Sequence, residues 1–239
     1  MAVRREAIER LASLTMHDTP LKSSAAGAPR AGWRRIATRI LPRVVIDHVR
    51  ELRTLSSAER RAHVSVTVRR LVPGSGGLPR GMTSESAVLF VCYGNIIRSA
   101  LAEALYRKHS AELGAMRVRV RSAGLSAKPG READARAVAA GRALGVNLEP
   151  HRAQSLTQAL VDEADVIFIM DRLNEAKLLA RFPTARRKVR RLGSLAKDGH
   201  SDLIEDPYVH DTTHVAAAAM RIDRATAALA AILNGEPTT

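Results

Sequence analysis

The sequence predicts an α/β fold, a three-layer sandwich with a central four-stranded parallel sheet, preceded by a helical, partly disordered N-terminal extension. Two observations support this prediction. After residue 86, apolar runs alternate with helical segments, which is typical of parallel sheets with right-handed crossovers. A stretch rich in Gly, Pro and Ser at 73–86 separates this part from a basic, helical one. We therefore expect an extension over 1–72, a linker over 73–86 and a main domain over 87–239.

The extension contains a segment with the periodicity of an amphipathic helix, between residues 33 and 70. Its apolar residues recur three or four positions apart, at Val45, Val49, Leu52 and Leu55. Pro42 starts this helix or kinks an earlier one. An apolar stripe on a short helix must be buried somewhere, so it packs on the main domain, pairs with another copy or binds a partner.

Two further segments of the extension have recognisable sequence signals. Ser56 and Glu59 have the spacing of a capping box, which predicts a helix that begins directly after Ser56. Residues 18–32 are rich in Ser, Ala, Gly and Pro and are predicted to be disordered. We favour a docking role for the extension on an acidic partner or an anionic surface, because a flexible linker would loosen its packing on the domain.

The main domain shows the expected alternation in order along the chain. The apolar runs at 87–91 and 165–170 are typical of central strands buried on both faces. The alternating segment 117–121 and the basic segment 187–193 suit the two edge strands. Helices are expected from about residue 98 and over 133–145, 174–182 and 214–233. Ligands of such sheets bind where the strands end, and Cys92 follows the first strand.

Composition and charge restrict the possible functions. Apolar residues make up 46% of the 239, and no apolar run is long enough for a membrane span or a secretory signal. The single cysteine rules out an internal disulfide and argues against a zinc cluster, which predicts a cytoplasmic protein with a reduced thiol. The net charge is +14, of which residues 1–84 carry +10, so the basic character belongs to the N-terminal third.

The stretch from Cys92 to Ser99 has the residues of an anion site between a strand and a helix. Backbone N–H groups converge in such a loop, Gly94 permits a tight turn, and Asn95 tolerates a left-handed conformation. The guanidinium of Arg98 can donate to two phosphate oxygens. The same positive surroundings favour the thiolate of Cys92, which is the nucleophilic form, and Ser99 can donate to its sulfur.

At these residues the sequence closely resembles the low-molecular-weight protein tyrosine phosphatases. The pattern C-x-G-N-x-x-R-S after an apolar strand reads here VLFVCYGNIIRSALAEAL. The resemblance continues in order through RSAGL, HRAQSL, MDRLN and IEDPY, and covers roughly residues 87–233. It implies a fold of the phosphotyrosine phosphatase I type and hydrolysis of phosphotyrosine on proteins, without a metal or other cofactor.

The resemblance also implies roles for single residues. Cys92 would form a phosphocysteine intermediate, Arg98 would bind the phosphate, and Asp206 would protonate the leaving group and later activate water. His151 would support the loop from outside the site. The substrate site would be lined by the loop and the mouth, namely Tyr93, Gly94, Asn95, Ile96, Ile97, Ser99 and Tyr208.

Three alternative functions use the same fold. Arsenate reductases of this type relay electrons through several cysteines, whereas this chain has one. Protein-arginine phosphatases prefer threonine four residues after the nucleophile, where Ile96 favours phosphotyrosine instead. The third alternative is a non-catalytic phosphate-binding module.

The site departs from the family's pattern at two places. Ile97 replaces a frequent second cysteine, and the loop 125–134 has no aromatic residue to flank the substrate.

Overall fold

The computed structural model describes residues 55–69, 78–79, 81–115, 118–199 and 201–235. The chain divides into two compact units between His48 and Val49, and every described residue belongs to the second unit. The periodic segment before Leu55, Pro42 and the segment 18–32 therefore lie outside the described residues. Among the helices in the described part of the chain, none is long and apolar enough to cross a membrane.

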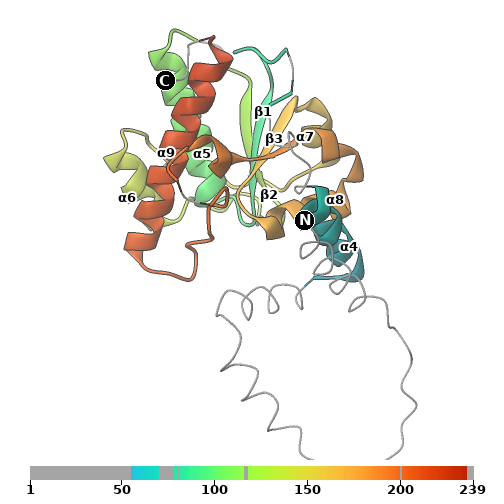
Figure 1. Cartoon of the computed structure of the whole chain (residues 1–239). Helices are drawn as coiled ribbons and strands as arrows, with labels where there is room; N and C mark the ends of the chain where they lie inside the picture. Colours follow the sequence, from blue (N-terminus) through green and yellow to red (C-terminus); the bar gives the residue numbers. More distant parts are fainter. Residues whose placement is uncertain (1–54, 70–77, 80, 116–117, 200, 236–239) are drawn as a thin grey trace, which may run out of the picture. The chain divides into compact units, whose positions relative to one another are not determined.

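The centre of this unit is the predicted four-stranded parallel sheet, and its strand order is β2-β1-β3-β4 (Figure 1). The strands are β1 (Val88–Cys92), β2 (Val120–Gly124), β3 (Val166–Ile169) and β4 (Val189–Arg191). The central strands β1 and β3 are buried along their whole length, which confirms the interpretation of the two apolar runs. β2 and β4 form the edges, but β2 starts three residues later than the alternating segment suggested.

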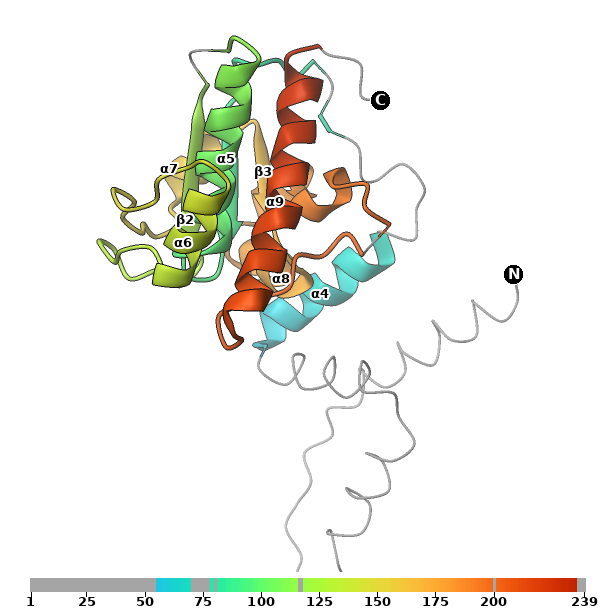
Figure 2. The same ribbon diagram turned by 90° about the vertical axis from the view of Figure 1, so that its left-hand side faces the viewer.

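Helices cover both faces of the sheet, which gives the three expected layers (Figures 1 and 2). The helices are α5 (Arg98–Glu112), α6 (Ala135–Ala143), α7 (Gln158–Glu163), α8 (Arg172–Arg181) and α9 (Thr212–Leu233). α5, α6 and α9 bury their apolar side chains against one face, and α7 and α8 do so against the other. The short helix α7 was not predicted, because six residues are too few to show a helical period.

A further helix, α4 (Ser57–Arg69), begins where the capping box predicted. The Ser56 N–H donates to Glu59 Oε2 at 2.6 Å, and the Glu59 N–H donates to Ser56 Oγ at 3.3 Å. This helix lies along α8 in both views, with Ala62 buried in the apolar cluster of that face (Figures 1 and 2). Although the sequence assigned α4 to the extension, this segment packs on the domain. Leu55 and Ala62 are buried, and Ala62 belongs to the apolar cluster on that face of the sheet.

Candidate active site

The loop that follows β1 starts at the carboxyl end of the sheet and leads directly into α5. Asn95 has φ 55°, a left-handed conformation of the kind that asparagine tolerates. Gly124, at the end of the neighbouring strand β2, makes the close packing of the loop possible. A Cβ on Gly124 would lie only 2.8 Å from the carbonyl oxygen of Tyr93. The sequence does not predict this role for Gly124, because Tyr93 and Asn95, against which it packs, are distant in the chain.

The thiol of Cys92 lies inside this loop, and the residue is only 3% exposed. Its sulfur accepts a hydrogen bond from the Asn95 N–H at 3.3 Å. The hydroxyl of Ser99 lies 3.0 Å from the same sulfur, in the first turn of α5. Donors of this kind stabilise a thiolate more than a thiol, so the surroundings suit a cysteine that acts as a nucleophile.

The side chain of Asn95 ties the loop to its neighbours. Its amide nitrogen donates to Ser99 Oγ and to Ser122 Oγ, both at 2.9 Å. Its amide oxygen accepts from the Gln154 N–H at 2.9 Å. The His151 Nε2 lies 2.7 Å from the Asn95 carbonyl oxygen, so His151 stands beside the loop as the sequence suggested. Ser122 and Gln154 were not predicted, since nothing in their local sequence indicates a contact with Asn95.

The guanidinium of Arg98 is almost completely buried and is held from two sides. Its Nη1 donates to Asp171 at 2.6 Å and to the Ile204 carbonyl at 3.0 Å, while Nη2 pairs with Asp206 at 2.5 Å. Burial alone would lower the pKa of Arg98, but Asp171, Cys92 and Asp206 together raise it above the ordinary value. Arg98 is therefore a permanent cation next to the Cys92 thiol.

Asp171 is a site residue that the sequence analysis missed. It caps α8, where its carboxylate accepts from the Asn174 N–H at 2.7 Å, and it also orients Arg98. Its only sequence signal was its place two residues after the end of β3, at the same sheet edge as Cys92.

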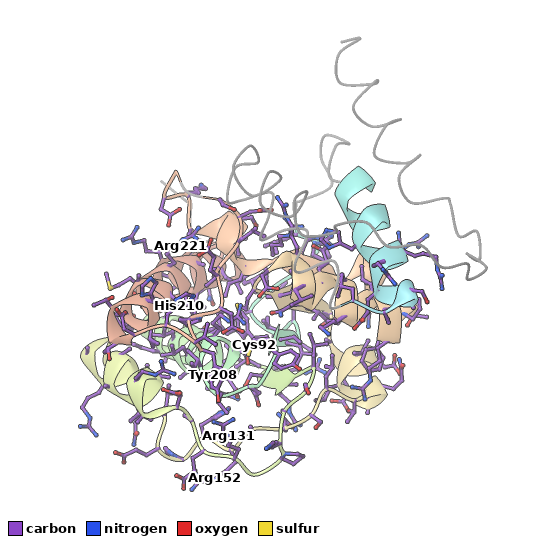
Figure 3. All side chains as sticks on the ribbon, turned by 90° about the horizontal axis from the view of Figure 1, so that it is seen from below. Cys92, Arg131, Arg152, Tyr208, His210 and Arg221 are labelled. Carbon is purple, nitrogen blue, oxygen red and sulfur yellow. The ribbon has the colours of Figure 1, made fainter. Side chains whose placement is uncertain are left out.

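The mouth of the site is formed by the loop before α9. The carboxylate of Asp206 is 44% exposed and accepts from the Tyr208 N–H at 3.2 Å. The ring of Tyr208 is about half exposed, and the guanidinium of Arg131 lies 5.9 Å from its centre. Figure 3 looks onto this face and shows Cys92, Tyr208 and Arg131 in one region. Tyr93 is also exposed and belongs to the loop that holds Cys92.

Arg136 connects the loop before α9 with the loop around Cys92. It donates to the carbonyl oxygens of Tyr208 and His210, and it pairs with Asp134 at 2.8 Å. The Asp134 N–H in turn donates to the Ile96 carbonyl at 2.9 Å. The side-chain hydrogen bond from Arg136 holds the pKa of Asp134 below its ordinary value, so this carboxylate stays ionised.

The start of α5 differs from the starts of the helices around it. A side chain caps each of α6, α7, α8 and α9, whereas Ile97 at the start of α5 provides no such hydrogen bond. The N-terminal amides and the positive end of the helix dipole at α5 therefore suit a bound anion.

In the described part of the chain, no group of three His, Cys, Asp or Glu side chains could hold a metal ion.

Together these groups place a buried thiol beside hydrogen-bond donors and a permanent cation, and comparison with known proteins identifies the family. The sequence pattern of the family described as low molecular weight phosphotyrosine protein phosphatase matches residues 87–238. The chain belongs to this family and is a phosphatase of its type.

Relatives in this family include enzymes with different substrates. A probable low molecular weight protein-tyrosine-phosphatase, EpsP of Ralstonia solanacearum, is 39% identical over 51% of this chain and 77% of its own length. A protein-arginine-phosphatase of Bacillus subtilis is 36% identical over 51% of this chain and 79% of its own length. The structure of Vibrio vulnificus Wzb in complex with benzylphosphonate has a TM-score of 0.56 and 32% identity, covering 62% of this chain and 99% of that one.

Proposed function

We propose that this protein hydrolyses phosphotyrosine on proteins through a phosphocysteine intermediate. The observation that carries the proposal is the contact of the buried Arg98 with Asp206, since Arg98 also interacts electrostatically with the buried Cys92. Asp206 is far from Cys92 in the sequence, so only the fold brings together a nucleophile, a cation and a carboxylic acid. These are the three groups that hydrolysis through a covalent intermediate needs.

The substrate phosphate binds to the donors of Arg98 that do not hold the guanidinium in its orientation. Asp171 and the Ile204 carbonyl hold Nη1, so the guanidinium keeps its orientation. Nη2 contacts Asp206, and we infer that a phosphate oxygen of the substrate takes this place. The exchange leaves the Asp206 carboxyl group next to the bound phosphate, at the side from which the tyrosine oxygen enters.

The reaction then proceeds in two steps. The Cys92 thiolate attacks phosphorus, the sulfur–phosphorus bond forms and the bond to the tyrosine oxygen breaks, while Asp206 gives its proton to that oxygen. In the second step, Asp206 takes a proton from water, and the water oxygen attacks phosphorus. The sulfur–phosphorus bond breaks, which releases inorganic phosphate and restores the thiolate. Arg98 and the loop amides stabilise the charge on the phosphoryl oxygens in both steps.

Two features favour phosphotyrosine over phosphoarginine as the substrate. Two exposed aromatic rings, Tyr93 and Tyr208, belong to the loops around the site and suit a flat substrate ring. Ile96 occupies the position where protein-arginine phosphatases are expected to have threonine, and it is 5% exposed and packed in the core. An apolar side chain there offers no hydroxyl to a guanidinium substrate.

The proposal also includes the substrate protein, the cellular compartment and a docking partner. The substrate is a tyrosine-phosphorylated protein. We place the enzyme in the cytoplasm because its only cysteine needs to stay reduced. The basic N-terminal part of the chain before α4 is the candidate for docking on an acidic partner or an anionic surface, whereas 73–86 connects α4 with β1.

The test is hydrolysis of para-nitrophenyl phosphate, a phosphotyrosine peptide and a phosphoarginine protein by the full-length chain. We expect activity on the first two and far less on the third. Cys92→Ser should lower kcat by roughly 10⁴-fold or more, since a hydroxyl is a much poorer nucleophile. The variant should still bind inorganic phosphate in a calorimetric titration. A Cys92→Ser protein that keeps its activity, or a parent chain that prefers phosphoarginine, would overturn the proposal.

A further inference from the structure

A recess of about 400 Å³ lies beside the loop that holds Cys92. We call it the side recess. Its walls come from the start of α4, from α8, from the cysteine loop and from the loop after β2. The lining residues include Glu59, Tyr93, Leu125, Lys177, Ala180 and Arg181.

One wall of the side recess lies outside the part of the chain that matches the phosphatase family. The family pattern starts at residue 87, whereas Ser56, Ala58 and Glu59 precede it. These residues are held in place by the packing of α4 on α8 and by the ion pair of Glu59 with Lys177 at 3.2 Å. The recess is therefore a feature that this chain adds to the family's phosphate site.

The charges around the side recess leave one cation available. Glu59 offsets Lys177, whose ammonium lies 5.9 Å from the centre of the Tyr93 ring. Arg181 is exposed at the end of α8 and contacts the ring of Phe182. In the described part of the chain no carboxylate pairs with Arg181, so the lining residues carry one net positive charge. An anionic group in the recess would meet a guanidinium that is not already neutralised.

Tyr93 connects the side recess with the catalytic site. It follows Cys92 directly in the loop, and its exposed ring lines the recess. A phosphotyrosine whose phosphate lies against Arg98 has its main chain at the rim of the site. A peptide that leaves this rim over Tyr93 passes into the recess, where Leu125 and Ala180 offer apolar surface to the stem of a side chain.

We propose that the side recess binds an acidic side chain of the phosphoprotein next to the phosphotyrosine, with Arg181 as its cationic partner. The proposal rests on the proposed function, because it concerns the residues that flank the group hydrolysed there. It makes α4 a part of substrate recognition, since this helix closes the recess and its Glu59 neutralises Lys177.

The first test compares phosphotyrosine peptides that differ only in one flanking residue, Glu or Gln, at each position near the phosphotyrosine. At one or more positions the parent chain should have a higher kcat/KM for the Glu peptide, by roughly threefold to tenfold. Arg181→Glu should abolish or reverse this preference. The matched control is Arg187→Glu, which makes the same charge change at an exposed residue outside the recess and should keep the preference.

A second variant tests the α4 wall without changing charge. Ala58→Trp should fill the recess and lower kcat/KM for the Glu peptide several-fold relative to para-nitrophenyl phosphate. Ser57→Trp, at the neighbouring exposed position outside the recess lining, is the control and should not change that ratio. The inference is wrong if Glu and Gln peptides react equally in the parent, or if Arg187→Glu affects the preference as much as Arg181→Glu. A parent that hydrolyses no phosphotyrosine substrate would instead overturn the proposed function itself.

Discussion

The two loops that form the proposed catalytic site differ in how they are held. Asn95 in the cysteine loop and Ser99 in the first turn of α5 are completely buried, and side chains from three parts of the chain bond to Asn95. In the loop before α9, Asp206 and Tyr208 are about half exposed and Val209 is 83% exposed. This acid loop is held mainly through backbone carbonyls and through the contact of Asp206 with Arg98.

This difference follows from what each loop does in the proposed mechanism. Donors that stabilise a transition state need to be oriented before the reaction, because reorientation would cost free energy during the reaction. A buried loop with satisfied polar groups meets this need. Asp206 has to give up its contact with Arg98 when the substrate phosphate binds, and it later has to contact a water molecule. It therefore needs solvent exposure and some freedom to move. We therefore expect changes in the two loops to have different kinetic signatures.

The largest effect expected after loss of the nucleophile comes from Asp206→Asn in the acid loop. An amide cannot protonate the leaving oxygen, and protonation matters most when that oxygen is basic. We expect kcat to fall by roughly 10³-fold for phenyl phosphate and by much less for para-nitrophenyl phosphate. Steady-state kinetics with the two substrates would measure this. Equal losses for both leaving groups would argue against the acid role.

Asn95→Ala should break the cysteine loop, with a loss that does not depend on the leaving group. The variant removes contacts with Ser99, Ser122 and the Gln154 N–H, and alanine tolerates the left-handed backbone less well. We expect kcat/KM to fall by roughly 10²-fold. The free energy of unfolding should fall by about 2–4 kcal/mol. Asn95→Gly keeps the backbone conformation accessible, so it separates the lost contacts from the strain. A leaving-group-dependent loss would contradict the assignment.

Arg136→Ala should loosen the acid loop without touching the reacting atoms. The variant loses the donors to the Tyr208 and His210 carbonyls, so Asp206 is positioned less well. We expect a loss of roughly tenfold in kcat for phenyl phosphate and a smaller one for para-nitrophenyl phosphate. Arg142→Ala is the control, because Arg142 lies on the same helix and pairs only with exposed Glu149 among the residues described here.

The smallest effect concerns the attachment of α4 and depends on pH. Partial burial alone would raise the pKa of Glu59, but the hydrogen bonds from Ser56 and the pair with Lys177 hold it below the ordinary 4.5. A lowered pKa in the folded state means that ionised Glu59 stabilises the fold above pH 4.5 and loses this contribution as the pH falls through the folded-state pKa. Glu59→Gln should therefore cost about 0.5–1 kcal/mol near neutral pH and almost nothing in acid.

Chemical denaturation of the parent and Glu59→Gln across this pH range would measure the difference. Glu85→Gln serves as the control at an exposed position before β1 and should show no such dependence. A stability difference that stays constant from neutral to acid pH would mean that the ion pair does not hold α4.

The sequence was sufficient for the sheet, most of its helices and the position of the cysteine loop. Buried parallel strands appear as continuous apolar runs, and a strand–loop–helix unit is a local feature, so Cys92, Asn95 and Arg98 stand in one short stretch that can be interpreted directly. The capping box of Ser56 and Glu59 also predicted the start of α4, because its partners are three residues apart.

Only the tertiary structure decided the contacts between distant segments. Asp171 orients Arg98, Ser122 and Gln154 hold Asn95, and Gly124 permits close packing of the loop, yet none of these side chains has a local signal for its role. The same holds for α4, whose apolar residues could have been buried in several ways. Its packing on α8, and with it the recess beside Tyr93, depends on the apolar surface that α8 presents, which is fixed by the fold and not by the helix's own sequence.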